Sequence, residues 1–288
     1  MGSGRHGGEL DRAPPSAIAP AGAGRWPKVV DVIDLHCHVL PGIDDGPEAI
    51  EGSVALARAA AQAGIHQLVA TPHVSATYRN DAATIARLVA ELNERLGAEG
   101  IDLEVLAGAE IAITYLPEIS PRQLPLLGLG GGEWLLVEPP FAAVAPALER
   151  LVLAVCAEGH RVVLAHPERC PALRRDRAVV GALAAQGVLM SITAGSLVGQ
   201  FGGEVKRYAL ELAREGLIHN VTSDAHDTER RPPGLSGAIE AAGLASLGDW
   251  LTHEVPAAIL SGGMIPARPA AVTGAAPRRR RLAWRSTR

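Results

Sequence analysis

Short apolar runs alternate with longer Ala/Leu/Glu/Arg-rich segments through most of this 288-residue chain, and this alternation constrains the fold more than any other feature. The runs are rich in Val, Leu and Ile, which is typical of parallel strands buried on both faces. Several of the segments between them end on glycine, as helices commonly do. The pattern predicts seven strands, at residues 29–36, 67–71, 103–111, 134–138, 162–166, 188–193 and 220–223.

Helices are predicted between these strands, and the repeated alternation favours a parallel α/β architecture. The predicted helices span residues 47–63, 82–99, 143–158, 171–186, 204–215 and 235–247, and residues 114–132 are expected to form a loop with a short helix. Seven strands in one series indicate a single-domain (β/α)₇ TIM-like barrel, with a doubly wound open sheet as the alternative. We expect residues 1–28 to be a disordered extension, 29–265 the barrel, and 266–288 a disordered Arg-rich tail.

Composition excludes several other classes of protein. The net charge of −4 gives no reason to expect nucleic acid as a partner, and three scattered cysteines do not form a disulfide framework. The N-terminal residues lack the continuous apolar core of a signal peptide, and no later stretch is long and apolar enough for a transmembrane segment. These features predict a cytoplasmic protein.

Side chains that bind metal ions follow six of the seven predicted strands at their carboxyl ends. His36 and His38 lie at the end of the first strand, and alternation of side chains along a strand directs both to the same side. Parallel α/β barrels form their sites at this edge. The sequence therefore predicts a metal centre made of His36, His38, Asp45, His73, Glu110, Glu138, His166, Asp224 and His226.

Five other histidines provide an internal comparison. His66, His160 and His219 precede the ligand histidines of their strands by six or seven residues, which is roughly 20 Å along a strand. They should lie at the opposite end of the barrel. His6 is in the N-terminal extension and His253 is in a terminal amphipathic segment, so we expect all five to be structural or exposed.

The predicted ligands are imidazoles and carboxylates without a set of thiolates, and they exceed what one ion needs. Two or three divalent ions are expected, with Mn²⁺, Fe or Zn²⁺ as the candidates. Such a centre attracts phosphate monoesters and lowers the pKa of bound water, so that a metal-activated hydroxide forms near neutral pH. Arg169 and Arg231 follow two of the ligand histidines, and their guanidinium groups would hold phosphoryl oxygens.

Other phosphate chemistries do not fit the sequence. The residues six positions after Cys37, Cys156 and Cys170 are not arginine, which excludes the cysteine-dependent tyrosine phosphatase signature. There is also no Walker A motif and no Gly-x-Ser-x-Gly elbow. Cys37 should point away from the metal ions because it lies between the two histidines.

The ordered set of motifs resembles the polymerase-and-histidinol-phosphatase (PHP) superfamily. The motifs are His36-x-His38, Thr71-Pro72-His73, Glu110, Glu138, His166-Pro167-Glu168-Arg169 and Ser223-Asp224-x-His226. Within it, Leu40-Pro41-Gly42-Ile43-Asp44-Asp45-Gly46-Pro47 and Arg231-Pro232-Pro233 resemble the bacterial capsule-associated metal-dependent protein-tyrosine phosphatases. This resemblance spans about residues 32–260.

The resemblance implies a distorted (β/α)₇ barrel with three divalent metal ions, often Mn²⁺, that hydrolyses phosphotyrosine. It implies one ion at His36, His38, Glu110 and Asp224, and a second at Glu110, Glu138 and His166, with Glu110 as the bridge. The third would bind Asp45, His73 and His226, and Arg169 and Arg231 would be the catalytic arginines. The usual partner is the phosphotyrosine-bearing tail of a bacterial tyrosine kinase that controls capsular polysaccharide or exopolysaccharide synthesis.

Other functions remain open at this stage. The same centre would serve a small-molecule phosphomonoesterase, such as a histidinol phosphatase, or another PHP phosphoesterase. A catalytically silent module that binds phosphotyrosine tails is a further alternative, although it would not need all nine ligands. Asp44 has no predicted role. Cys170 stands where an aromatic residue often follows the His-Pro-Glu-Arg motif in the family.

Overall fold

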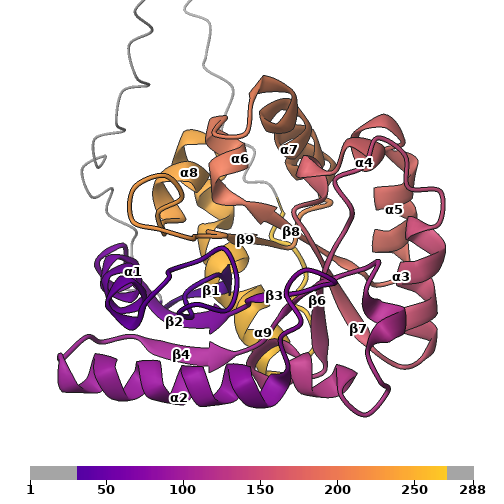
Figure 1. The fold of residues 1–288 in the computed structure, drawn as a ribbon. Helices are drawn as coiled ribbons and strands as arrows, with labels where there is room; N and C mark the ends of the chain where they lie inside the picture. The colour runs from indigo at the N-terminus through magenta and orange to yellow at the C-terminus, as the bar shows by residue number, and fades with distance from the viewer. Residues whose placement is uncertain (1–30, 271–288) are drawn as a thin grey trace, which may run out of the picture.

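The computed structural model describes residues 31–270, and within them the chain alternates between strands and helices as predicted (Figure 1). All paired strands run parallel to one another. The strands are β1 (Val32–Cys37), β2 (Ile65–Ala70), β3 (His73–Val74), β4 (Glu104–Ala107), β5 (Glu110–Ala112), β6 (Trp134–Glu138), β7 (Arg161–Ala165), β8 (Leu189–Thr193) and β9 (Asn220–Thr222).

Most helices lie around the outside of these strands. They are α1 (Ile50–Gln62), α2 (Ala82–Ala98), α3 (Leu148–Ala157), α4 (Pro171–Arg175), α5 (Ala178–Ala185), α6 (Ala194–Val198), α7 (Gly203–Glu215), α8 (Ser236–Ala241) and α9 (Val255–Ser261). Shorter 3₁₀ or π turns are η1 (Leu116–Glu118), η2 (Leu124–Leu127), η3 (Leu129–Gly131), η4 (Pro167–Arg169), η5 (Ala245–Leu247) and η6 (Trp250–Glu254). Figure 1 shows α1 and α2 beside β1, β2 and β4, with α3, α4 and α5 on the side of β7.

The strands form two sheets. One has the order β1-β2-β4 and the other the order β3-β5-β6-β7-β8-β9. Central strands such as β8 are buried along their whole length, which is the burial that a parallel sheet covered on both faces requires. The predicted parallel α/β class is therefore confirmed.

Backbone hydrogen bonds join the two sheets at the carboxyl ends of their strands. Beyond β1 and β9, His38 N donates to Ala225 O at 2.9 Å and Asp224 N donates to His36 O at 2.9 Å. On the other side, the chain itself passes from one sheet to the other, because two residues separate β2 from β3 and two separate β4 from β5. These contacts bring segments that are far apart in the sequence to the same end of the molecule, where the predicted ligands lie.

Three predicted elements are divided in the structure. The helix expected over residues 235–247 ends as α8 at Ala241, and the 3₁₀ turn η5 follows after Gly243, which has φ = 73°. The strand expected over residues 103–111 is divided into β4 and β5, which belong to different sheets. The break falls at Gly108, where a Cβ atom would lie 2.7 Å from Val69 Cγ1, so the chain there passes too close to β2 for a side chain. The helix expected over residues 171–186 is likewise divided, because Asp176 leaves the helical conformation between α4 and α5.

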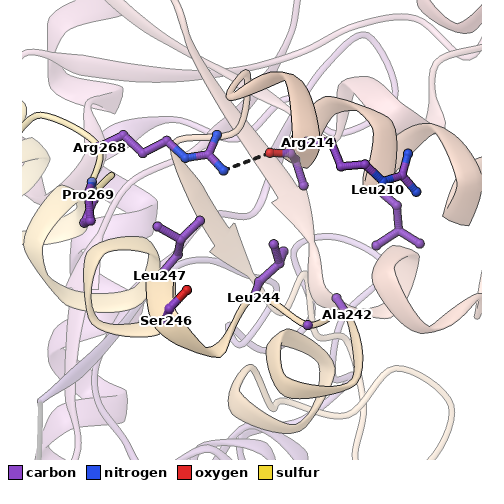
Figure 2. Close-up of a pocket in the computed structure, with 10 residues that line it drawn as sticks. Leu210, Arg214, Ala242, Leu244, Ser246, Leu247, Arg268 and Pro269 are labelled. Carbon is purple, nitrogen blue, oxygen red and sulfur yellow. Dashed lines mark hydrogen bonds between the residues drawn. The ribbon is translucent and has the colours of Figure 1, made fainter. Parts of the chain in front are cut away.

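The last described residues return to the fold at the amino ends of the strands. Trp250 Nε1 donates to Pro266 O at 3.0 Å, and the Arg268 guanidinium donates to Ala213 O at 2.8 Å. Figure 2 shows a cavity of about 340 Å³ between Arg268, the end of α7 and the residues after α8. The predicted disordered extension and most of the predicted Arg-rich tail lie outside the described residues.

Among residues 31–270, we found no helix with the length and apolar character needed to cross a bilayer.

Candidate metal centre

All nine predicted ligands lie together at the carboxyl ends of the strands. They form four overlapping groups of donor atoms, each within 4.8 Å of one another: His38–Asp45–His73–His226, His36–His38–Glu110, His36–His166–Asp224 and His73–Glu110–Glu138. The structure thus brings the whole set of predicted ligands into one place.

The first group is centred on His36, in β1, and His38, which directly follows β1. As the strand period predicts, both point to the same side, and their Nε2 atoms lie 3.2 Å apart. Cys37 points away, and its thiol donates to Ala225 O at 3.5 Å. The Nε2 atoms of both histidines also lie 3.3 Å from Glu110 Oε2 and 3.4–3.5 Å from Asp224 Oδ1.

These separations fit a metal ion. In a tetrahedral site, the distance between two ligand atoms is about 1.63 times the metal–ligand bond, so bonds of about 2.0–2.2 Å correspond to about 3.3–3.6 Å. Five of the six distances among these four atoms are given above, and they range from 3.2 to 3.5 Å. The carboxylate oxygen Glu110 Oε2 is buried and has no hydrogen-bond donor among the described residues, as a donor atom reserved for a cation would be.

A second group surrounds Asp45. Its Oδ1 atom lies 3.2 Å from His226 Nε2 and 3.5 Å from His73 Nε2. The hydrogen bond from His226 is the main cause that holds the pKa of Asp45 below its ordinary value, against partial burial. This is the set that the resemblance implies for the third ion.

Glu110 connects these residues to the remaining ligands. Its Oε1 atom lies 2.8 Å from His166 Nε2, whereas Oε2 lies 3.0 Å from His73 Nδ1 and also faces the two histidines at the end of β1. The carboxylate thus offers one oxygen to each of two neighbouring positions, as a bridging ligand would. Glu138 is more distant: its oxygens lie 3.9 Å from His166 Nε2 and 3.9 Å from His73 Nδ1.

The pKa shifts in this centre follow from burial and crowding of charge. Burial, reinforced by the charge of Glu110, raises the pKa of Glu138. Burial alone would raise the pKa of Glu110 too, but the facing His36 and His166 outweigh it and hold this pKa well below its usual range. Burial lowers the pKa of His166 to about 4, which favours the neutral imidazole that a metal ion requires.

Two of the predicted ligands have a backbone conformation that is rare outside glycine. His166 has φ = 31° and Asp224 has φ = 51°, and they are the only non-glycine residues with positive φ among residues 31–270. His166 directly follows β7, and Asp224 lies two residues beyond the end of β9. Such strain persists where surrounding structure imposes it and is concentrated at functional sites.

The two predicted catalytic arginines converge on the same carboxylate. The guanidinium groups of Arg169 and Arg231 both donate to Asp224 Oδ2, and Arg231 Nη1 lies 2.9 Å from His226 Nε2. Arg169 comes from η4 and Arg231 from the loop after β9. Two cations at the edge of the ligand cluster form a site for an anion with several oxygens, such as a phosphoryl group.

Sequence reasoning missed three buried or partly buried acids that support this centre. Asp44 Oδ2 accepts from His38 Nδ1 at 2.7 Å and from His73 N at 3.1 Å, so the residue without a predicted role orients two ligands. Asp34 Oδ1 accepts from His36 N at 3.2 Å and from Ser223 N at 3.1 Å, and burial raises its pKa to about 6.

The third is Glu168, which is fully buried beside Arg169. Its Oε1 atom accepts from Ser196 Oγ at 2.6 Å and from Thr193 N at 3.0 Å, and burial raises its pKa to about 7. Asp34 and Asp44 could have been found from the sequence, because each lies within two residues of a predicted ligand, His36 or Asp45. The partners of Glu168 are about 25 residues away and give no local signal.

The other described histidines lie away from this centre. His66 is near the start of β2, and His219 Nδ1, just before β9, accepts from Met190 N at 3.0 Å. His253 Nδ1 lies 2.8 Å from Asp31 O. His6 lies outside the described residues.

Comparison with known proteins points to one family. The family model for capsular polysaccharide synthesis proteins of the CpsB/CapC type matches residues 32–245. Tyrosine-protein phosphatase YwqE of Bacillus subtilis is 39% identical over 201 residues, which is 69% of this chain and 79% of YwqE. Tyrosine-protein phosphatase CpsB of Streptococcus pneumoniae is 27% identical over 221 residues, 73% of this chain and 88% of CpsB.

A solved structure gives the same result. A chain from the crystal structures of YwqE from Bacillus subtilis and CpsB from Streptococcus pneumoniae, described as unique metal-dependent tyrosine phosphatases, superposes with a TM-score of 0.72 at 34% identity. The superposition covers 81% of this chain and 96% of that chain. The resemblance drawn from the sequence motifs is thereby confirmed, and the protein belongs to the CpsB/CapC family.

Proposed function

We propose that this protein is a metal-dependent protein-tyrosine phosphatase, a phosphoric monoester hydrolase. The observation that carries the proposal is the convergence of nine imidazole and carboxylate ligands with two arginines at one end of the parallel strands. The names of the family's tyrosine phosphatases, YwqE and CpsB, support the same activity.

Three divalent ions, Mn²⁺ before Fe or Zn²⁺, suit this donor set best. Imidazole and carboxylate donors without thiolates favour these ions over a structural zinc site. The charge of three divalent ions exceeds that of the four carboxylates by two, which favours a dianionic phosphate monoester. When bound, such ions supply Lewis-acid stabilisation of phosphoryl oxygens and lower the pKa of water.

The residues of the chain contribute binding and orientation. Arg169 and Arg231 would exchange their contact with Asp224 for the non-bridging oxygens of the phosphoryl group, where they offset developing negative charge. Asp44 keeps the imidazole of His38 in one orientation, with Nε2 toward the cluster. The phenol group of tyrosine has a pKa of about 10, so its phenolate is a better leaving group than an alkoxide and needs less protonation as it departs.

The finer features of fold, location and partner belong to the same proposal. We infer that the backbone bonds between the ends of β1 and β9, with the direct chain connections from β2 to β3 and from β4 to β5, close the two sheets into a distorted (β/α)₇ barrel. The substrate is a phosphotyrosine-bearing protein, with the cytoplasmic tail of a bacterial tyrosine kinase in capsular polysaccharide or exopolysaccharide synthesis as the partner. An enzyme with that substrate acts in the cytoplasm.

The test is turnover of a phosphotyrosine peptide after chelation and add-back of Mn²⁺, Fe²⁺, Zn²⁺ or Mg²⁺. We expect chelation to abolish the activity and one of these ions to restore it, and Asp45→Ala and His166→Ala to be inactive while still folded. Faster turnover of histidinol phosphate than of the peptide would instead identify a small-molecule phosphatase. Unchanged activity after chelation would refute the proposal.

A further inference from the structure

The chain has two phenylalanines, and both lie against the same guanidinium group. The Cζ atom of Arg169 is 5.1 Å from the ring centroid of Phe141 and 4.4 Å from that of Phe201. These rings come from the segment after β6 and the segment after α6, so three separate parts of the chain meet at one arginine. Cations over aromatic faces at this range are held by the ring quadrupole.

This contact restricts the side chain of Arg169 without using its hydrogen-bonding groups. Its backbone is held as well, because Arg174 Nη1 donates to Arg169 O at 2.8 Å. The Phe201 ring packs against α6, where a Cβ atom at Gly195 would lie 3.2 Å from Phe201 Cε2. The guanidinium N–H groups therefore remain directed at the edge of the ligand cluster, where Arg169 contacts Asp224.

Phe141 differs from Phe201 in its exposure. Its side chain is 54% exposed, although its ring also stacks on the imidazole of His166 with centroids 5.6 Å apart and planes inclined by 23°. Phe141 thus lies beside the imidazole of a predicted metal ligand and beside a predicted phosphate-binding arginine. About half of its surface is open to solvent, which leaves apolar area for contact with an aromatic ring of a ligand.

We propose that Phe141 is a specificity-determining residue that packs against the phenyl ring of the substrate, while Phe141 and Phe201 together position Arg169. The inference rests on the proposed phosphatase function and deepens it, because it predicts a preference for aryl over alkyl phosphate esters. A phosphoryl group held by Arg169 and Arg231 would bring the attached ring within reach of the exposed part of Phe141, because the Phe141 ring lies 5.1 Å from the Arg169 guanidinium.

The experiment compares two non-hydrolysable probes, phenylphosphonate and methylphosphonate, by calorimetric titration of the metal-loaded full chain. Phe141→Ala should weaken phenylphosphonate binding about tenfold more than it weakens methylphosphonate binding. Only the phenyl probe loses an aromatic contact, whereas both probes share any effect of the lost ring on Arg169. Phe141→Tyr keeps an aromatic ring at this position and should retain the wild-type preference for phenylphosphonate. Val144→Ala is the matched control, because Val144 is an exposed apolar residue of the same segment at 72% exposure.

Phe201→Leu gives the second arm of the test. It should weaken both phosphonates by a similar factor, since Arg169 loses one of its two flanking rings, and thermal unfolding of each variant establishes that it is folded. Equal loss of both probes in Phe141→Ala, no loss, or no preference for phenylphosphonate in the wild-type protein would overturn the proposal. Failure of the proposed function would appear separately, as absence of turnover of a phosphotyrosine peptide by the wild-type protein.

Discussion

Asp44 is the residue whose replacement tests most directly how this centre is organised. Its Oδ2 atom accepts from His38 Nδ1 at 2.7 Å, and its Oδ1 atom accepts from Gly46 N at 3.0 Å. With the proton on Nδ1, the Nε2 atom of His38 keeps its lone pair toward Glu110 and Asp224. Asp44→Asn removes the charge and leaves the size of the side chain almost unchanged.

The magnitude follows from the kind of bond that is lost. A hydrogen bond to a carboxylate is roughly twice as strong as one between neutral groups, and the amide can also turn its NH₂ toward His38 and place the proton on Nε2. Loss of such a partner behind a metal-binding histidine typically costs 10- to 100-fold in metal affinity, or about 1.4–2.8 kcal/mol. We therefore expect Asp44→Asn to bind Mn²⁺ about 10- to 100-fold more weakly.

The assay is competition for Mn²⁺ with a fluorescent chelator. Asp81→Asn is the matched control, because Asp81 caps α2 through Thr84 N at 2.8 Å, and asparagine is an equally good cap. The control should keep the wild-type affinity. Wild-type Mn²⁺ affinity in a folded Asp44→Asn protein would refute the role assigned to Asp44.

Three further predictions concern Arg169, Glu168 and His66. Arg169→Ala should lower kcat/KM on a phosphotyrosine peptide by about 10²–10³-fold, the usual cost of one transition-state donor, while metal content measured by mass spectrometry stays the same; loss of metal instead would contradict this role. Burial raises the pKa of Glu168 from 4.5 to about 7, so the folded metal-free protein holds a proton there that the unfolded chain releases. The resulting stability, of the order of 3 kcal/mol, is present below about pH 4.5 and is lost as pH rises through about 7. Glu168→Gln should therefore make the Tm of the metal-free protein fall less steeply between pH 5 and 8. An unchanged slope would show that another group holds the proton. His66→Ala should keep metal content and activity within twofold, because His66 lies near the amino end of β2, and a large loss of either would contradict its placement away from the centre.

The clustering of the candidate ligands could be predicted because its signal is local. Apart from Asp45, which lies in the turn after β1, each candidate ligand ends or follows a strand, and parallel strands bring their carboxyl ends to one edge. Six strand ends therefore implied one cluster. The two-residue period of a strand places His36 and His38 on the same side, where their Nε2 atoms lie 3.2 Å apart. The boundaries were less accurate where neighbouring strands decide them, as at Gly108, whose position against Val69 divides β4 from β5.

The sequence by itself determined which residues are available to bind metal ions and phosphate, and at the end of which strand each of them lies. Only the tertiary structure decided that Asp44 supports His38, that Glu110 divides its oxygens between neighbouring ligands, and that both phenylalanines flank Arg169. The physical reason is range. Side-chain periodicity is a property of a few adjacent residues, whereas these contacts join segments that only the pairing and packing of distant strands bring together.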